Sequence, residues 1–204
     1  MTGCAAVLLE CNARTLHSWS GIKLAKGESS AVITSVLRNK HTVRRWQKAK
    51  GLILDEVSML SKKIFEIIEK LARAIKKDTR PFGGMQVVFT GDFFQLPPVG
   101  TSGEEDTSQF CFESSKWTSV FKPENHIELT TMFRQTDSVY IDILQQIRRG
   151  YLDQDKQVIL EKYVKRNFDS ELTNGCVPTK LFPLRSKTDF VNTICVASIQ
   201  AAIR

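Results

Sequence analysis

The sequence lacks several features that assign many proteins to a class at once. No apolar run among its 204 residues approaches the ~20 residues that a membrane-spanning helix needs. Its N-terminal segment has no basic start and is too short for a secretory signal peptide. Internal repeats and low-complexity tracts are also absent. Nothing in the sequence therefore favours a membrane or secreted protein, and we expect it to act inside the cell.

Cysteine is scarce and irregularly spaced. The sequence contains no C-x-x-C pair among its five cysteines, Cys4, Cys11, Cys111, Cys176 and Cys195. An odd number excludes a complete disulfide framework, and the spacing is not that of a zinc site. We expect reduced thiols, as is usual for proteins inside the cell.

Acidic residues are fewer than basic ones. Lys and Arg number 29 against 22 Asp and Glu, which gives a net charge of +7. A basic excess is compatible with a polyanionic partner such as nucleic acid, although many proteins that bind none share it. Basic side chains concentrate in residues 38–50, which contain no acid. That run is either a solvated helix face or a surface that binds DNA.

What the sequence does contain is an alternation of strand and helix patterns. Residues 51–55, GLILD, are continuously apolar up to the acid, as expected for a strand covered on both faces, and residues 85–92, MQVVFTGD, form a second strand. Between them, residues 61–77 have apolar side chains at helical spacing, with Ser61 as the expected N-cap. This alternation predicts an α/β fold with a mainly parallel sheet flanked by helices.

The remaining segments are interpreted in the same way. We predict a turn at residues 14–21, strands at 126–130 and 179–184, and helices at 4–10, 31–49, 114–120, 137–150, 153–166 and 186–204. With 42% hydrophobic residues, a chain of this length suits one domain, or one domain and part of another.

Two acids, Asp55 and Glu56, directly follow the first strand. Ligands of parallel sheets gather at the carboxyl ends of strands, Mg²⁺ on nucleotide phosphates prefers a carboxylate oxygen, and hydrolysis needs a group that orients water. Adjacent strand residues point in different directions, so Asp55 can face a metal while Glu56 faces the water. The alternative is an ordinary acidic strand end.

The second strand ends at Asp92, and Gln95 lies just beyond it. Its side chain can hydrogen-bond a γ-phosphate, or it can make only a hydrogen bond within its own loop.

Taken together, these segments resemble the petite-integration-frequency (Pif) helicase family, a RecD-like family of superfamily one. The similar strings follow the family's order: TGCAAVLLECNARTLHSWSGI at residues 2–22, LILDEVSML at 52–60, FEIIEKLARAIKKDTRPFGGMQVVFTGDFFQLPPV at 65–99, FCFESSKWTSV at 110–120, ELTTMFRQTDSVYIDILQQIRRG at 128–150 and LFPLRSKTDFVN at 181–192. The string at 81–99 is highly specific, whereas a lone Asp-Glu is not. The resemblance covers nearly the whole chain and implies a RecA-like P-loop NTPase fold.

The resemblance also implies roles for particular residues. Asp55 would hold Mg²⁺, Glu56 would position the attacking water, and Gln95 would sense the γ-phosphate of bound ATP. Arg134 would be the arginine finger from a second RecA-like domain, because arginine is always charged and its planar fork matches phosphate oxygens. Without the resemblance, a surface ion pair is the simpler interpretation of Arg134.

Single-stranded DNA and DNA forks are the partners that the resemblance implies. Thr2, Thr15 and His17 lie in the element that would contact DNA, although His17 could instead be a core or capping residue. Phe93 and Phe94 are candidates for stacking on bases, which requires only an aromatic face. Their alternative is core packing, and we expect one of the two to be buried and the other to lie near DNA.

One motif of such enzymes is missing. None of the 11 glycines is followed by lysine, so the phosphate-binding string G-x-x-x-x-G-K-[ST] does not occur. We therefore expect a fold that is incomplete at both ends, with part of a RecA-like domain 1A at residues 1–122 and the start of domain 2A at residues 123–204.

The implied function is ATP-dependent 5′–3′ DNA unwinding in replication, repair, recombination and telomere maintenance. A eukaryotic member would act in the nucleus or mitochondrion, and we expect a monomer. The chain alone is expected to be inactive, and poorly soluble because its sheet edge would be unpaired. The alternative function is that of a non-catalytic DNA-binding remnant.

Overall fold

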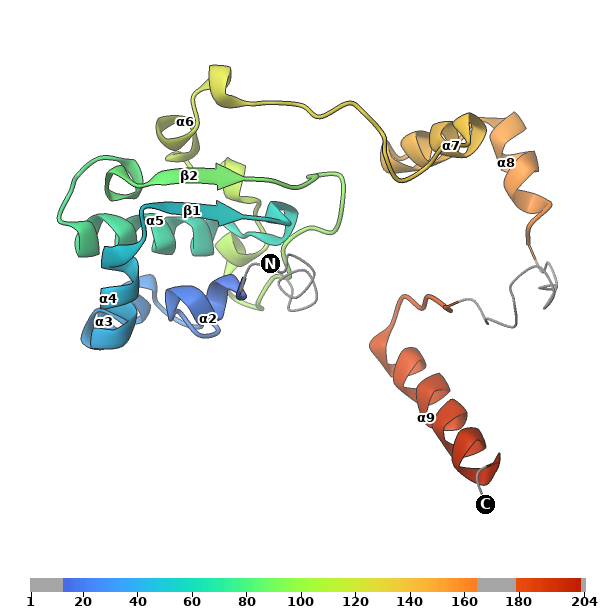
Figure 1. The fold of residues 1–204 in the computed structure, drawn as a ribbon, viewed down its shortest axis with the longest axis horizontal. Coiled ribbons are helices and arrows are strands. Elements are labelled where there is room, and N and C mark those ends of the chain that lie inside the picture. The colour runs from blue at the N-terminus through green and yellow to red at the C-terminus, as the bar shows by residue number, and fades with distance from the viewer. Residues whose placement is uncertain (1–12, 165–178, 203–204) are drawn as a thin grey trace. The chain divides into compact units, whose positions relative to one another are not determined.

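A computed structural model describes residues 13–164 and 179–202 (Figure 1). The chain divides into two compact units, Met1–Tyr151 and Leu152–Arg204. The domain boundary expected after residue 122 stays a prediction, and the helix expected at residues 4–10 lies outside the described residues. Within the described ranges, no helix is long and apolar enough to cross a membrane.

The sheet of the described residues has two parallel strands, β1 (Gly51–Leu54) and β2 (Gln86–Phe89). They pair in register, with Leu54 opposite Phe89. Helix α5 (Lys62–Lys76) connects them and covers one face of the sheet (Figure 1). The predicted α/β fold, with a parallel sheet flanked by helices, is confirmed.

Burial alternates along β1 because successive side chains point to opposite faces. Leu52 and Leu54 are buried against the helices, whereas Ile53 on the other face is 74% exposed. A strand covered on both faces, as predicted from the apolar run, is therefore wrong for the described residues. The apolar run in the sequence shows that the side chains on both faces of β1 are apolar. Covering the second face would require further helices or strands packed against it.

Helix α5 forms where its spacing predicts. The Ser61 hydroxyl accepts a hydrogen bond from the Ile64 amide at 3.3 Å, which confirms the expected N-cap. Phe65, Ile68 and Leu71 are buried completely along one face. The helix ends at Lys77, which has a left-handed conformation that terminates the regular hydrogen-bonding pattern.

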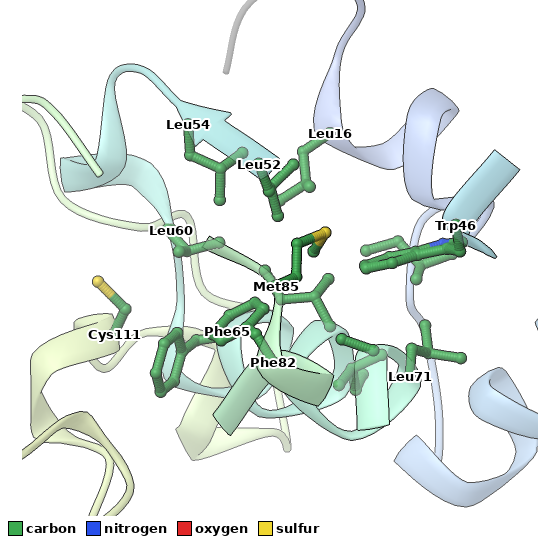
Figure 2. Close-up of a cluster of buried hydrophobic side chains, with 14 of the residues drawn as sticks. Leu16, Trp46, Leu52, Leu54, Leu60, Phe65, Leu71, Phe82, Met85 and Cys111 are labelled. Carbon is green, nitrogen blue, oxygen red and sulfur yellow. The ribbon is translucent and has the colours of Figure 1, made fainter. Parts of the chain in front are cut away.

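One hydrophobic core lies around α5 (Figure 2). Trp46, Phe65 and Phe82 are each fully buried in it. The indole nitrogen of Trp46 donates to the Ser20 carbonyl at 3.1 Å, so its one polar atom is satisfied. The core therefore joins segments before β1, between the strands and after β2 into one packed body.

From residue 13 to β1 the structure has three helices: α2 (Leu16–Ser20), α3 (Ser29–Arg38) and α4 (Lys40–Lys48). The turn predicted at residues 14–21 is wrong, because α2 forms there between an N-cap at Thr15 and a left-handed C-cap at Gly21. A single helix at residues 31–49 is also wrong. Asn39 has ψ of 97°, and its side chain accepts from the Thr42 amide at 3.1 Å, so one helix ends and a new one is capped at this residue.

The helices after β2 are α6 (Trp117–Val120), α7 (Ser138–Arg148), α8 (Gln154–Glu161) and α9 (Arg185–Ala202). Short 3-10 turns occur from β1 onward, at Val57–Met59, Pro81–Gly84, Glu105–Thr107, Cys111–Glu113 and Pro123–Asn125. Helices thus form in the four segments predicted for them. The strands predicted at 126–130 and 179–184 are wrong. Neither segment has a pairing strand among the described residues, and Ile127 and Leu181 are 83% and 91% exposed.

Candidate functional site

The backbone of Thr90 ties the carboxyl ends of the two strands together. Its amide donates to the Leu54 carbonyl at 2.8 Å, and its carbonyl accepts from the Val57 amide at 3.1 Å. The residues between these contacts, Asp55 and Glu56, therefore lie against the chain that leaves β2. The predicted meeting of both acid-ended segments at one edge of the sheet is present.

Glu56 has an unusual backbone conformation. Its φ of 59° and ψ of 48° are left-handed, which residues other than glycine adopt at a cost. Its amide donates to Asp55 Oδ1 at 2.9 Å, and both acids are half-buried. Strain of this kind persists where the surrounding structure imposes it, and it is concentrated at functional sites. The conformation makes Glu56 a candidate functional residue, and an ordinary acidic strand end stays the alternative for this pair.

Gly91 allows the close approach of the two loops. It has φ of 153°, and a Cβ atom there would lie 2.7 Å from the Val57 nitrogen. Any side chain at this position would force the chain after β2 away from the turn at Glu56. The glycine therefore helps to hold the acid pair in place.

Asp92 is held by an arginine from α7. Its two carboxylate oxygens accept from Nε and Nη2 of Arg148 at 2.6 and 2.8 Å. These bonds, together with one from the Phe94 amide, hold the pKa of Asp92 below its ordinary value. Gln95 is exposed, and its backbone N–H donates to the Asp92 carbonyl at 2.9 Å. Its side chain also hydrogen-bonds the Asp92 carboxylate. The loop role considered for Gln95 is thus present.

The two phenylalanines of the loop differ in their surroundings. Phe93 is half-buried and packs edge-on against Phe110 and Phe112, with ring centroids 5.9 and 4.8 Å apart. Phe94 is 64% exposed, and the Arg148 guanidinium carbon lies 4.6 Å from its ring centroid. Phe93 is therefore part of the packed body, while Phe94 presents an aromatic surface to solvent.

Two of the three residues considered for DNA contact near the N-terminus are described. Thr15 accepts a hydrogen bond from the Ser18 amide at 3.4 Å and so caps α2. His17 is half-buried, and burial lowers its pKa. His17 also lines a cleft of about 260 Å³ whose wall includes the buried Lys63. Thr2 lies outside the described residues.

Arg134 is not in contact with the acid pair. It is exposed in a segment without regular secondary structure, and within the described part of the chain its side chain makes no hydrogen bond or ion pair. The surface ion pair considered for it is therefore not seen. The structure joins Asp55 and Glu56 to the loop of Gln95 through Thr90, but leaves Arg134 apart from them.

The donor set at Asp55 fits a magnesium ion that is shared with a nucleotide. The described residues contain no cluster of three or more acidic, histidine or cysteine side chains that would hold a metal by themselves. Magnesium in nucleotide sites takes one or two carboxylates and completes its shell with water and phosphate oxygens. A single half-buried carboxylate at a strand end meets that requirement.

Sequence reasoning missed three residues that organise this site: Thr90, Gly91 and Arg148. The glycine immediately before Asp92 was the one available signal, because a glycine at a strand end often marks a close approach of backbone. Arg148 gave no local signal, since its partner lies 56 residues earlier in the chain.

Two parallel strands with covering helices form an α/β domain, and the solved structures that it resembles assign this domain to the RecA-like class. A family model described as PIF1-like helicase matches residues 1–158. The chain therefore belongs to the PIF1-like helicase family, as its sequence motifs predicted.

Individual relatives agree with this assignment. The chain is 39% identical over 191 residues to the ATP-dependent DNA helicase RRM3 of Saccharomyces cerevisiae, covering 94% of this chain and 25% of that protein. The crystal structure of Pif1 helicase from Candida albicans matches with a TM-score of 0.80 and 34% identity, over 90% of this chain and 40% of that one. A Bacteroides Pif1 structure in complex with ADP-AlF3 and single-stranded DNA matches with a TM-score of 0.65 and 27% identity, over 78% and 38%. The chain thus spans about a quarter of the length of RRM3 and about two fifths of these two structures.

Proposed function

We propose that this chain is part of an ATP-dependent 5′–3′ DNA helicase and contributes its acid pair and γ-phosphate sensor. The observation that carries the proposal is the left-handed Glu56, held beside Asp55 at the carboxyl end of β1 by Thr90 and Gly91. Such an arrangement has a clear use in phosphoryl transfer, which requires one carboxylate for a metal and another for water.

Each residue has one task in this proposal. Asp55 binds Mg²⁺, which neutralises charge on the phosphate oxygens when it is bound. Glu56 accepts a hydrogen bond from the attacking water and orients it. Gln95 hydrogen-bonds the γ-phosphate with its exposed side-chain amide and so senses whether that phosphate is present. Arg134 brings a positive charge to the phosphates once its segment reaches the site.

The DNA contacts are assigned to the loop after β2 and to the N-terminal segment. Phe94 stacks on bases with its exposed ring, whereas Phe93 supports the loop from within the packed body. His17, Thr15 and Thr2 contact the DNA backbone from the N-terminal segment. We propose that single-stranded DNA at forks is the substrate, that the protein acts as a monomer, and that a eukaryotic member works in the nucleus or mitochondrion during replication, repair, recombination and telomere maintenance.

The test is a chimaera in which this chain replaces the matched stretch of Saccharomyces RRM3. We expect DNA-stimulated ATP hydrolysis and unwinding of a fork from the chimaera. Glu56→Gln should reduce the hydrolysis rate by about 10³-fold or more without weakening nucleotide binding, because it removes the group that orients water. Asp55→Asn should reduce the rate and also weaken Mg²⁺-dependent nucleotide binding.

A matched control is Glu105→Gln, the same chemical change at an exposed acid in the 3-10 turn Glu105–Thr107. It should retain full activity. A folded chimaera that is inactive, or one in which Glu56→Gln behaves like the control, would contradict the proposal. DNA binding retained without any ATP hydrolysis would instead support the non-catalytic alternative. The chain by itself has no G-x-x-x-x-G-K-[ST] string and is expected to hydrolyse no ATP.

A further inference from the structure

The basic run of residues 38–50 folds into an ordered stripe of charge. Lys40, Arg44 and Lys48 occupy successive turns of α4, at positions i, i+4 and i+8, so they share one face. The opposite face carries Thr42 and Trp46, which are buried in the core. All three basic side chains are exposed, and they extend over about 12 Å of helix axis.

No acidic partner of these charges is present in the part of the chain that the structure describes. Within the described residues, neither the three stripe residues nor the flanking Arg38 and Lys50 form a side-chain hydrogen bond or an ion pair. Like charges at i, i+4 spacing destabilise a helix, and Lys40 also lies unfavourably at the positive N-terminal end of α4. The stripe therefore does not serve the stability of the helix.

The stripe is separate from the acid pair. Helix α4 leads into the amino end of β1, whereas Asp55 and Glu56 follow its carboxyl end (Figure 1). The four-residue strand alone places about 13 Å between these two ends. A nucleotide bound at the acid pair would not use these basic side chains.

We propose that the α4 stripe binds the phosphate backbone of double-stranded DNA. This inference rests on the proposed function for the nature of the polyanion, but concerns a second surface. Duplex DNA presents one phosphate per strand for every ~3.4 Å of its helix axis, so a stripe of about 12 Å lies within reach of several phosphates. Single-stranded DNA is bound with the help of aromatic side chains that stack on bases. Helix α4 has no exposed Phe, Tyr or Trp ring beside these charges, since Trp46 is buried; the exposed ring next to the stripe is the imidazole of His41.

The test compares duplex and single-stranded binding by fluorescence anisotropy. The probes are a labelled blunt duplex of about 20 base pairs and an oligothymidylate of equal length, titrated from roughly 50 to 200 mM salt. The triple variant Lys40→Gln, Arg44→Gln, Lys48→Gln removes the stripe while keeping good helix-forming residues. We expect roughly tenfold weaker duplex binding at the lowest salt, and a slope of log affinity against log salt that is smaller by about 2–3. Oligothymidylate binding should change less than twofold.

The matched control is Lys162→Gln, Lys180→Gln, Lys187→Gln, which removes the same charge from three exposed lysines after residue 151. It should keep duplex binding and the salt slope. Thermal melts should show that both triple variants stay folded.

Three results would each overturn the proposal: a wild-type chain that binds no duplex, equal losses in the two triple variants, or an equal loss of oligothymidylate and duplex. Loss of binding to phosphatidylserine vesicles with duplex binding retained would also overturn it, in favour of a lipid surface. The assay contains no nucleotide, so the absence of ATP hydrolysis in the chimaera would leave its outcome unaffected.

Discussion

The residues up to 121 and the described residues after them differ sharply in how they pack. The first region contains Trp46, Phe65 and Phe82 with no exposed surface. In the second, Ile143 and Gln146 are the only buried side chains among residues 122–164 and 179–196. One region therefore has a core that can impose strain, and the other leaves most of its apolar side chains in solvent.

This difference explains where the proposed chemistry lies. A strained residue such as Glu56 needs a packed surrounding to hold it, and it lies in the first region. Arg134 lies in the second region, where local stability is expected to be low because few apolar contacts are buried. An arginine that must approach a nucleotide only at one stage benefits from such a position.

The largest expected difference in stability between the two regions is the one caused by removing an aromatic side chain from the core. Phe65→Ala should lower the free energy of unfolding by about 3–5 kcal/mol, because the cavity lies among Phe82, Phe89 and Trp117. Phe133→Ala, at a residue that is 90% exposed, should change it by less than about 0.5 kcal/mol. Urea denaturation measures both. Equal losses would show that the second region is as well packed as the first.

A buried charge should have the next largest effect. Glu69 is 2% exposed and contacts Arg73 at 2.7 Å and Lys116 at 3.4 Å. Glu69→Gln should lower the free energy of unfolding by about 2–3 kcal/mol, because the buried carboxylate loses its charge-assisted contacts with Arg73 and Lys116. Asp189→Asn removes an exposed pair with Arg185 in the second region and should change it by less than about 0.5 kcal/mol. If neither substitution changed the free energy of unfolding in chemical denaturation, the two regions would differ in apolar packing but not in the strength of their ion pairs.

The glycine behind the acid pair gives a smaller effect. Gly91→Ala should lower the free energy of unfolding by about 2 kcal/mol, since its Cβ would meet the Val57 nitrogen at 2.7 Å. Gly150→Ala introduces a positive-φ alanine at φ of 80° with no atom within 4 Å, and should lower it by about 1 kcal/mol. Thermal denaturation of the two variants separates the steric contribution from the conformational one. Identical melting shifts would mean that the close approach is not rigid.

The smallest effect concerns the ion pair that joins the two regions. Arg148 lowers the pKa of Asp92 in the folded protein, so the pair stabilises the fold above the ordinary carboxyl pKa near 4, and this contribution is lost as pH falls through the lowered value. Arg148→Gln should therefore reduce stability by less than about 1 kcal/mol at pH 6, and the difference from wild type should vanish by about pH 2. Melting curves across this range measure it. A difference that persisted undiminished at the acid end would exclude the pairing as its cause.

Much of the site could be predicted because its signals are local. The acids at the end of β1, the cap at Ser61 and the helix after it depend on residues within one strand or one turn of each other. The roles of Asp55, Glu56, Gln95 and Arg134 came from ordered motifs and stay predictions. The strands at 126–130 and 179–184 failed for the opposite reason, because an apolar alternation becomes a strand only when another strand is present to pair with it.

By itself, the amino-acid sequence determined the family, the order of most helices and the two strands with the acids that follow them. Hydrophobic periodicity and capping act between neighbours in the chain, so these features were settled locally. Tertiary structure alone decided that Glu56 is left-handed, that Gly91 contacts Val57, and that Arg148 pairs with Asp92. Those contacts join residues far apart in sequence, and their geometry exists only after the core around α5 has packed.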